Sequence, residues 1–177
     1  MENMFPNLQE DPVQYNWLSL LREQQEAALE LPGTDVACSI DLATSAGILH
    51  FPNKKPVGQR LALLALSNLY GCLCQAHSPQ YSIFAVQGNR IRVQFKYANG
   101  LRVRGGGKTI GFAIRGATGD RVWADGQIEG NEILLWNDQV PQPVAVRYAW
   151  AANPLISVEN GAGLPLRPFR TDKTSPQ

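Results

Sequence analysis

The period of the hydrophobic pattern changes once along this chain, near residue 77. Before that point, apolar residues recur at helical spacing, as on the buried face of an amphipathic helix. After it, apolar and polar residues alternate, as along strands that turn one face toward a core. The pattern predicts an α+β protein in two parts, residues 1–76 and residues 77–177.

The first part is predicted to contain a helix, a strand, a loop and a second helix. The first helix spans about residues 13–30, and Leu31-Pro32-Gly33 ends it. Its apolar face is expected to carry Trp17, Leu20, Leu21 and Ala28. Residues 36–40 are small and apolar, as in a parallel strand that is buried on both faces. The second helix begins near Pro56 and ends at Gly71. This order is typical of a fragment of a doubly wound α/β sheet, in which one parallel strand needs neighbours to pair its edges.

The second part is predicted to be an antiparallel β-sandwich. Residues 90–97 alternate cleanly and follow a Gly88-Asn89 hairpin turn. Four residues of this strand, Ile91, Val93, Phe95 and Tyr97, are expected to face the core. Further strands are expected over 110–114, 122–128, 132–136 and 144–150, and the tail from residue 154 onward is expected to be loop.

Charge and composition exclude several classes of function. The 177 residues carry a net charge of +1 and no basic run, so neither a nucleic acid nor a membrane is an expected partner. The opening residues have no signal-peptide pattern, and no apolar run reaches the roughly 20 residues of a transmembrane helix. The three cysteines have no metal-binding spacing, and no metal or cofactor is expected.

His50 is the candidate catalytic residue. It lies in the loop after residues 36–40, and open α/β sheets place catalytic groups beyond the carboxyl ends of their strands. An imidazole there can act as general base and then as general acid, although a lone loop histidine can equally be structural. Asp41 could be the acid that orients His50, or it could simply cap the strand end. His77 lies in a linker and is expected to have no catalytic role.

Other polar and aromatic features are assigned structural roles. The charges of Arg22, Glu23 and Glu26 are expected to form a solvated helix face. The run 105–109 lacks the first glycine of a phosphate-binding loop and is assigned to a turn. No serine lies in a Gly-x-Ser-x-Gly turn, so no nucleophile is identified. Four aromatic residues could form a sugar-stacking platform, but on alternating strands they are more often core: Trp123, Trp136, Tyr148 and Trp150.

The region around His50 also resembles a known family. The run 50–63, His-Phe-Pro-Asn-Lys-Lys-Pro-Val-Gly-Gln-Arg-Leu-Ala-Leu, is similar to the His-Pro-x-Asn-Lys-x-x-Val-Gly-x-Arg-Leu-Ala-Leu stretch of sialate O-acetylesterases. Phe51 stands where that family has proline, and Gly47 stands where the acid of SGNH hydrolases precedes the histidine. Further segments resemble the family in the same order: Trp17 with 21–25, 144–154, 163–165 and 168–172.

The resemblance implies that His50 holds the catalytic-histidine position of an SGNH hydrolase. Residues 1–76 would then be the last elements of a flavodoxin-like esterase domain, and residues 77–177 its β-sandwich companion. The family's serine nucleophile lies in an amino-terminal Gly-Gln-Ser-Asn motif that this sequence does not contain. The chain alone is therefore expected to be inactive and to need an amino-terminal segment that carries the serine, with an O-acetylated sugar as substrate. The alternatives are a non-catalytic β-sandwich that binds carbohydrate or protein, and an inactive remnant.

Overall fold

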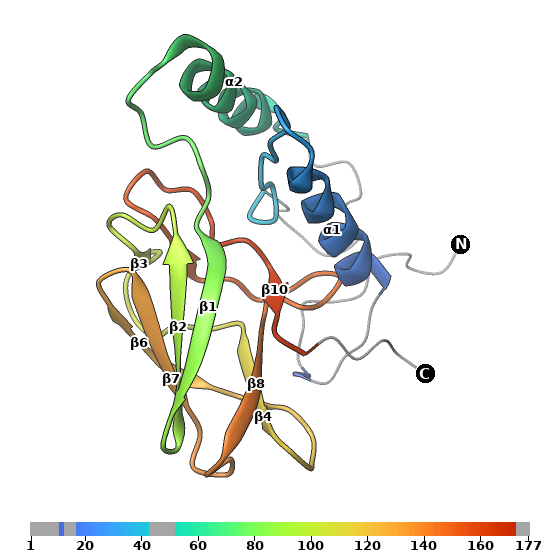
Figure 1. Cartoon of the computed structure of the whole chain (residues 1–177), viewed down its shortest axis with the longest axis vertical. Coiled ribbons are helices and arrows are strands. Elements are labelled where there is room, and N and C mark those ends of the chain that lie inside the picture. Colours follow the sequence, from blue (N-terminus) through green and yellow to red (C-terminus); the bar gives the residue numbers. More distant parts are fainter. Residues whose placement is uncertain (1–10, 13–16, 43–51, 173–177) are drawn as a thin grey trace.

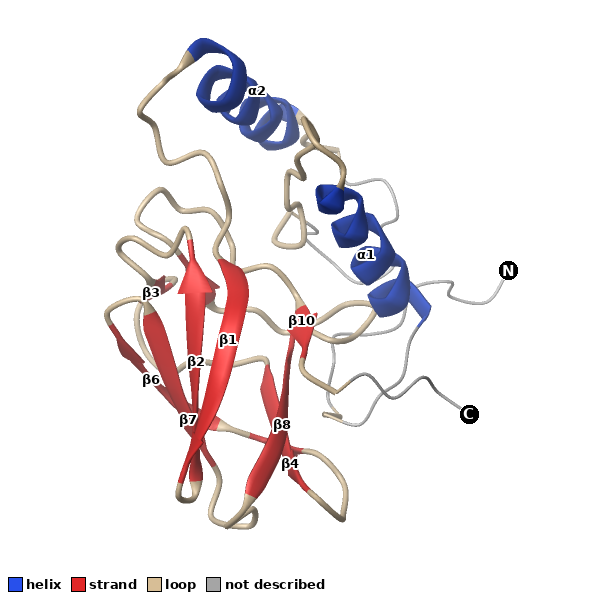
Figure 2. Cartoon of the chain, in the orientation of Figure 1, coloured by secondary structure: helices blue, strands red, loops and turns tan. Residues whose placement is uncertain are grey.

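The computed structural model describes residues 11–12, 17–42 and 52–172 (Figure 1). Helices lie at one end of the molecule and antiparallel sheets at the other (Figure 2). The helical elements are α1 (Trp17–Ala27), the short 3-10 helix η1 (Ala28–Glu30) and α2 (Lys55–Tyr70). The strands are β1 (Gln80–Gln87), β2 (Arg90–Lys96), β3 (Arg102–Val103), β4 (Phe112–Gly116), β5 (Val122–Trp123), β6 (Asp125–Glu129), β7 (Glu132–Trp136), β8 (Pro143–Tyr148), β9 (Val158–Glu159) and β10 (Phe169–Arg170).

Helix α2 begins and ends as its sequence predicts. Pro56 lies in the first turn, where its missing N–H leaves no hydrogen bond unmade. Gly71 ends the helix with φ of 68°, a left-handed conformation that glycine adopts without steric cost.

Helix α1 packs by the opposite face from the one expected. Its charged side chains, which were predicted to face water, contact the sandwich instead: Arg22 donates to the carbonyls of Ala151 and Ala152 at 2.6 and 2.7 Å. Trp17 and Leu21 of the predicted apolar face are 58% and 45% exposed. Hydrophobic periodicity shows which residues share a face, but it does not show which neighbour that face meets.

Residues 36–40 do not form a strand within the described part of the chain. The segment runs beside α2, because Arg60 contacts Cys38 and Asp41 while Asn68, two turns further along the helix, contacts Asp35. The chain and the helix therefore run in opposite directions, as in a strand–helix unit of an α/β fold. The predicted strand is missing because no described strand lies beside it to complete a hydrogen-bonded ladder.

The second part folds as two antiparallel four-stranded sheets. One sheet has the order β1-β2-β7-β6 and the other β10-β8-β4-β5, while β3 and β9 form a separate pair. Side chains from both sheets meet in one core, as in a sandwich. Its fully buried members include Ile91, Val93, Ile133 and Leu135 from the first sheet and Phe112, Ile114, Val146 and Tyr148 from the second.

The predicted hairpin is confirmed, and the predicted alternation holds except at its end. β1 and β2 pair antiparallel across Gly88-Asn89, and Ile91, Val93 and Phe95 are buried. The prediction for Tyr97 is wrong, because this residue is 49% exposed. The strand ends at Lys96, and Tyr97 takes a left-handed φ of 56° that turns its ring outward.

The remaining strands follow the sequence with shifted ends. β7 has the predicted bounds, whereas the predicted strand 122–128 divides at Ala124 into β5 and β6, which belong to different sheets. The tail is not all loop: β9 pairs with β3, and β10 adds a strand beside β8. Asn160, next to β9, is fully buried and anchors this part of the tail. Its amide nitrogen donates to the carbonyls of His77 and Tyr97.

Candidate functional site

Asp41 lies at the junction between the helical part and the sandwich. Its carboxylate receives two hydrogen bonds from Arg60 of α2, at 2.6 and 2.7 Å, in a bidentate pair. Arg104, just beyond β3, donates to the same carboxylate at 3.0 Å. The Asp41 side chain is only 5% exposed, so the pair is shielded from water. Asp41 is thus a charged clamp between the two parts of the molecule.

The clamp continues into the sandwich through Glu159 of β9. Arg104 donates to one oxygen of Glu159 at 2.7 Å, and Arg102 donates to the other at 3.0 Å. The contacts therefore form a line of alternating charge: Arg60, Asp41, Arg104, Glu159 and Arg102. Each carboxylate lies between two arginines. Such alternation stabilises partly buried charges that would be costly if unpaired.

The surroundings of Asp41 hold it in its ionised form. Burial raises the pKa of the Asp41 carboxyl, but hydrogen bonds and charge from Arg60 and then Arg104 outweigh burial, and the net shift is downward. The same balance lowers the pKa of Glu159 through Arg104 and Arg102. At neutral pH Asp41 is an acceptor of hydrogen bonds and carries no proton to give.

His50 lies outside the described residues, as do residues 43–49 and Phe51. The pairing of His50 with Asp41 is therefore a prediction that no described contact tests. Three serines of the described part, Ser19, Ser78 and Ser157, are buried, and Ser157 is hydrogen-bonded to the backbone of Ile110.

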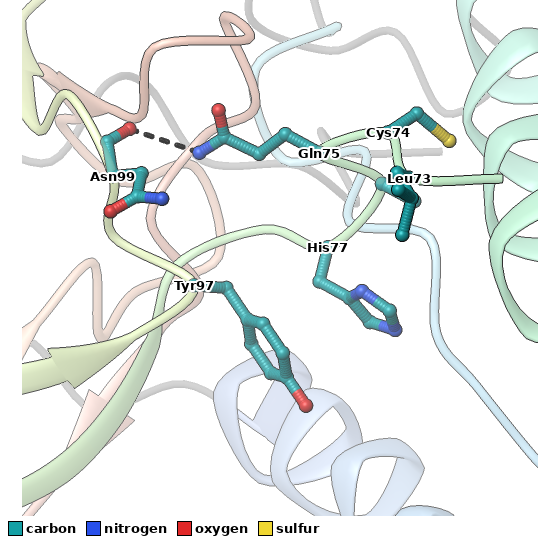
Figure 3. Close-up of a pocket in the computed structure, with 7 residues that line it drawn as sticks. Leu73, Cys74, Gln75, His77, Tyr97 and Asn99 are labelled. Carbon is teal, nitrogen blue, oxygen red and sulfur yellow. Dashed lines mark hydrogen bonds between the residues drawn. The ribbon is translucent and has the colours of Figure 1, made fainter.

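His77 has a more organised environment than its place in a linker suggested. Its ring stacks on Tyr97 with centroids 4.5 Å apart, and its Nε2 lies 2.7 Å from a carboxylate oxygen of Asp35. Both rings line a pocket of about 290 Å³ whose rim is fixed by a hydrogen bond from Gln75 to the carbonyl of Asn99 (Figure 3). No sequence pattern indicated this pair, because the two residues come from segments that meet only in the fold.

Asp35 joins four separate segments through its hydrogen bonds. Besides His77, it receives bonds from Asn68 of α2 at 3.0 Å, from the amide of Val36 at 2.7 Å and from Arg167 at 3.5 Å. Burial raises the pKa of Asp35, yet these donors together with His77 lower it overall. These contacts make Asp35 a junction between its own segment, α2, the linker at His77 and Arg167.

A second hollow of about 500 Å³ lies between α2 and residues 162–164. Its lining is mainly apolar, with Leu63, Leu66 and Leu164 among its members. Arg60 lines the same hollow, so it adjoins the Asp41 clamp.

No cluster of three or more His, Cys, Asp or Glu side chains in the described residues could hold a metal ion. No helix in the same residues is long and apolar enough to cross a membrane.

Solved structures that are similar to this chain include a carbohydrate acetylesterase. No family model and no curated protein matches the sequence. Among solved structures, the crystal structure of XAC1771, a carbohydrate acetylesterase from Xanthomonas citri, superposes with a TM-score of 0.86 at 35% sequence identity. This chain resembles part of a carbohydrate acetylesterase. The match covers 95% of this chain but only 40% of the Xanthomonas acetylesterase.

The similarity to the Xanthomonas acetylesterase supports a function related to carbohydrate esterases. It agrees, at this broader level, with the resemblance drawn from the sequence. More than half of the acetylesterase lies outside the match, so the activity of the whole enzyme belongs to the proposals that follow.

Proposed function

We propose that this chain is the histidine-bearing part of a carbohydrate O-acetylesterase. The observation that carries the proposal is the match of 95% of the chain to the Xanthomonas acetylesterase at 35% identity. Identity at this level over nearly the whole chain supports shared chemistry as well as a shared fold. The substrate is an O-acetyl ester on a sugar, and sialic acid is the narrower choice because the run 50–63 resembles sialate O-acetylesterases.

In the proposed reaction, His50 moves the proton and another segment supplies the nucleophile. His50 takes the proton from a serine hydroxyl as that oxygen attacks the acetyl carbonyl, and it then gives the proton to the departing sugar oxygen. Water attacks the acetyl-serine in the second half of the cycle, and acetate leaves. The serine belongs to an amino-terminal SGNH segment equivalent to the part of the Xanthomonas acetylesterase outside the match.

We assign Asp41 a positioning role in this reaction. Both of its oxygens already accept hydrogen bonds from arginines, and the net shift of its pKa is downward. These partners favour a clamp over an acid dedicated to His50. Arg60 lies on α2, which follows His50 in the chain, so the clamp ties together the two ends of the segment that carries the histidine.

The proposed division of the chain follows from the same reasoning. Residues 1–76 are the closing elements of the SGNH domain, and residues 77–177 are its sandwich companion. The antiparallel course of residues 35–41 along α2 supports the first assignment, since strand–helix units of α/β sheets have this course. Tyr148 and Trp150 are buried, which favours a core role for these two aromatic residues, whereas Trp123 and Trp136 are half-buried.

The function is tested by co-expressing this chain with the part of the Xanthomonas acetylesterase that lies outside the match. We expect release of acetate from an O-acetylated sugar by the pair and none by either partner alone. His50→Ala should reduce the rate by at least about 1,000-fold. His77→Ala is the matched control and should retain the rate. Full activity of the His50→Ala pair would contradict the proposal.

A further inference from the structure

The sheet β10-β8-β4-β5 turns a face rich in arginine away from the sandwich core. Ile114 of β4 and Val146 of β8 are buried in that core, and Val122 of β5 packs against it. Because side chains alternate along a strand, the residues next to these three point to the outer face of the sheet. Three arginines hold such positions, on β4, on β8 and just before β5: Arg115, Arg147 and Arg121.

One carboxylate serves all three arginines. Asp172, whose side chain is 4% exposed, accepts hydrogen bonds from Arg147 at 2.9 and 2.8 Å, and Arg121 donates to it as well. Arg115 forms no ion pair in the described chain. Its Nη1 donates to the carbonyl of Gly116 at 3.3 Å, and its buried Nε has no hydrogen-bond partner. The cluster therefore carries three positive charges and one negative charge.

The excess charge is concentrated on Arg115 and Arg121. The antiparallel pairing of β4 with β5 places these two residues side by side. Burial lowers the pKa of Arg121, and the like charge of Arg147 adds to the shift. Arg115 acts in the same direction, whereas Asp172 only partly opposes them. Since an arginine keeps its proton, this repulsion persists until an anion lies between the two guanidinium groups.

Trp123 lies on the same outer face, two residues beyond Arg121. It belongs to β5, the edge strand of this sheet, and its side chain is half-buried. An indole ring offers an apolar face to a flat ligand, and neighbouring arginines hold a carboxylate through paired N–H groups. The edge of the sheet therefore combines an aromatic surface with a site for a negative charge.

We infer that Arg115, Arg121 and Trp123 form a binding site for an acidic sugar. Its carboxylate lies between the two guanidinium groups, and its ring lies against the indole. The choice of a sugar rests on the proposed function, whereas the need for an anion rests on the charges of the cluster. The site belongs to the sandwich and uses neither His50 nor a serine nucleophile, so it binds the sugar without hydrolysing it.

The test is a titration of the full isotope-labelled chain with sialic acid, followed by nuclear magnetic resonance. We expect a saturable shift of the indole N–H signal of Trp123, which Trp123→Phe identifies by its loss. The methyl ester of sialic acid lacks the charge and should bind at least about 10-fold more weakly. Arg115→Gln should weaken the binding of sialic acid by a similar factor. Arg92→Gln, in the other sheet, is the matched control and should leave binding unchanged, because Arg92 already meets two carboxylates.

The stability of Arg115→Gln separates a binding role from a structural one. Its melting temperature should stay the same or rise, because the substitution removes a positive charge that the described chain does not pair. A lower melting temperature with unchanged binding would assign Arg115 to the fold and overturn the site.

The ligands themselves supply further outcomes that would overturn the site. These are the absence of any shift with sialic acid, an equal shift with its methyl ester, and an equal shift with acetate at the same concentration. Binding is measured here without turnover. A failure of the co-expressed pair to release acetate therefore contradicts the proposed function alone.

Discussion

At the scale of single residues, arginine–carboxylate pairs decide how this molecule is held together. Asp41 could be found from the sequence, because it follows a small apolar run. Its partners could not be found, because Arg60 and Arg104 reach it from a helix and from a loop of the sandwich. His77 was assigned to a linker, and its contacts with Asp35 and Tyr97 likewise depend on segments that meet only after folding.

Asp41→Asn should reduce the free energy of unfolding by about 2–3 kcal/mol, because it leaves Arg60 with a neutral partner in a site shielded from water. Urea unfolding at neutral pH measures this change. Asp120→Asn, in an exposed turn, is the control and should be neutral. Equal midpoints for both variants would mean that the clamp contributes nothing to stability.

The contribution of Asp41 should also depend on pH in a defined direction. Its pKa is lowered in the folded state, so the stabilisation is complete above the unfolded pKa of about 3.9 and disappears as the pH falls through the folded value. The difference between the wild type and Asp41→Asn should therefore shrink in acid. A difference that grows as the pH falls from 6 toward 3 would contradict the assignment.

At the scale of elements, local signals were reliable where one residue determines the geometry. Pro56, Gly71 and the Gly88-Asn89 turn fixed the ends of α2 and of the first hairpin. The pattern failed where the outcome depended on a neighbour: Trp17 was expected inside and Arg22 outside, and the structure reverses both. The strand 36–40 failed for a related reason, since a ladder requires a second strand.

Two glycines of different elements should respond oppositely to alanine. Gly111 precedes β4 with φ of 88°, and a Cβ there would collide with the carbonyl oxygen of Leu155, so Gly111→Ala should cost about 3 kcal/mol or more. Gly58 lies within α2 with open space around it, and Gly58→Ala should stabilise the chain by about 1 kcal/mol. Thermal unfolding of both variants tests the pair; a stabilised Gly111→Ala variant would show that the close approach to Leu155 is wrong.

At the scale of the whole molecule, the helical part is joined to the sandwich by charged groups and by Ile40, which packs against the sandwich core. Arg167 is the centre of this junction: its side chain is 2% exposed and contacts Glu26, Asp35 and the carbonyl of Val36. The sandwich has its own core, in which both sheets take part. The sequence could predict that core from alternation, but charges give no periodic signal from which their partners could be read.

Arg167→Met should cost about 3 kcal/mol, because it leaves two carboxylates without their buried partner. Hydrogen exchange should increase first in residues 17–42, while β2, β4, β7 and β8 stay protected. Arg92→Met removes a half-buried arginine that also meets two carboxylates, and its side chain is 23% exposed against 2% for Arg167, so the effect should be much smaller. Uniform loss of protection in the Arg167 variant would show that the two parts unfold as one unit.

The reactivity of the buried Cys38 thiol should report how often residues 36–40 open to solvent. Burial raises the pKa of the Cys38 thiol to about 11, whereas Cys72 is exposed and Cys74 half-exposed near the end of α2. Because only a thiolate is reactive, an alkylating reagent should modify the outer cysteines in the native state and reach Cys38 only when residues 36–40 move out of place. The rate of Cys38 alkylation would then report the frequency of this local opening, and a molecule bound to the segment would lower that rate.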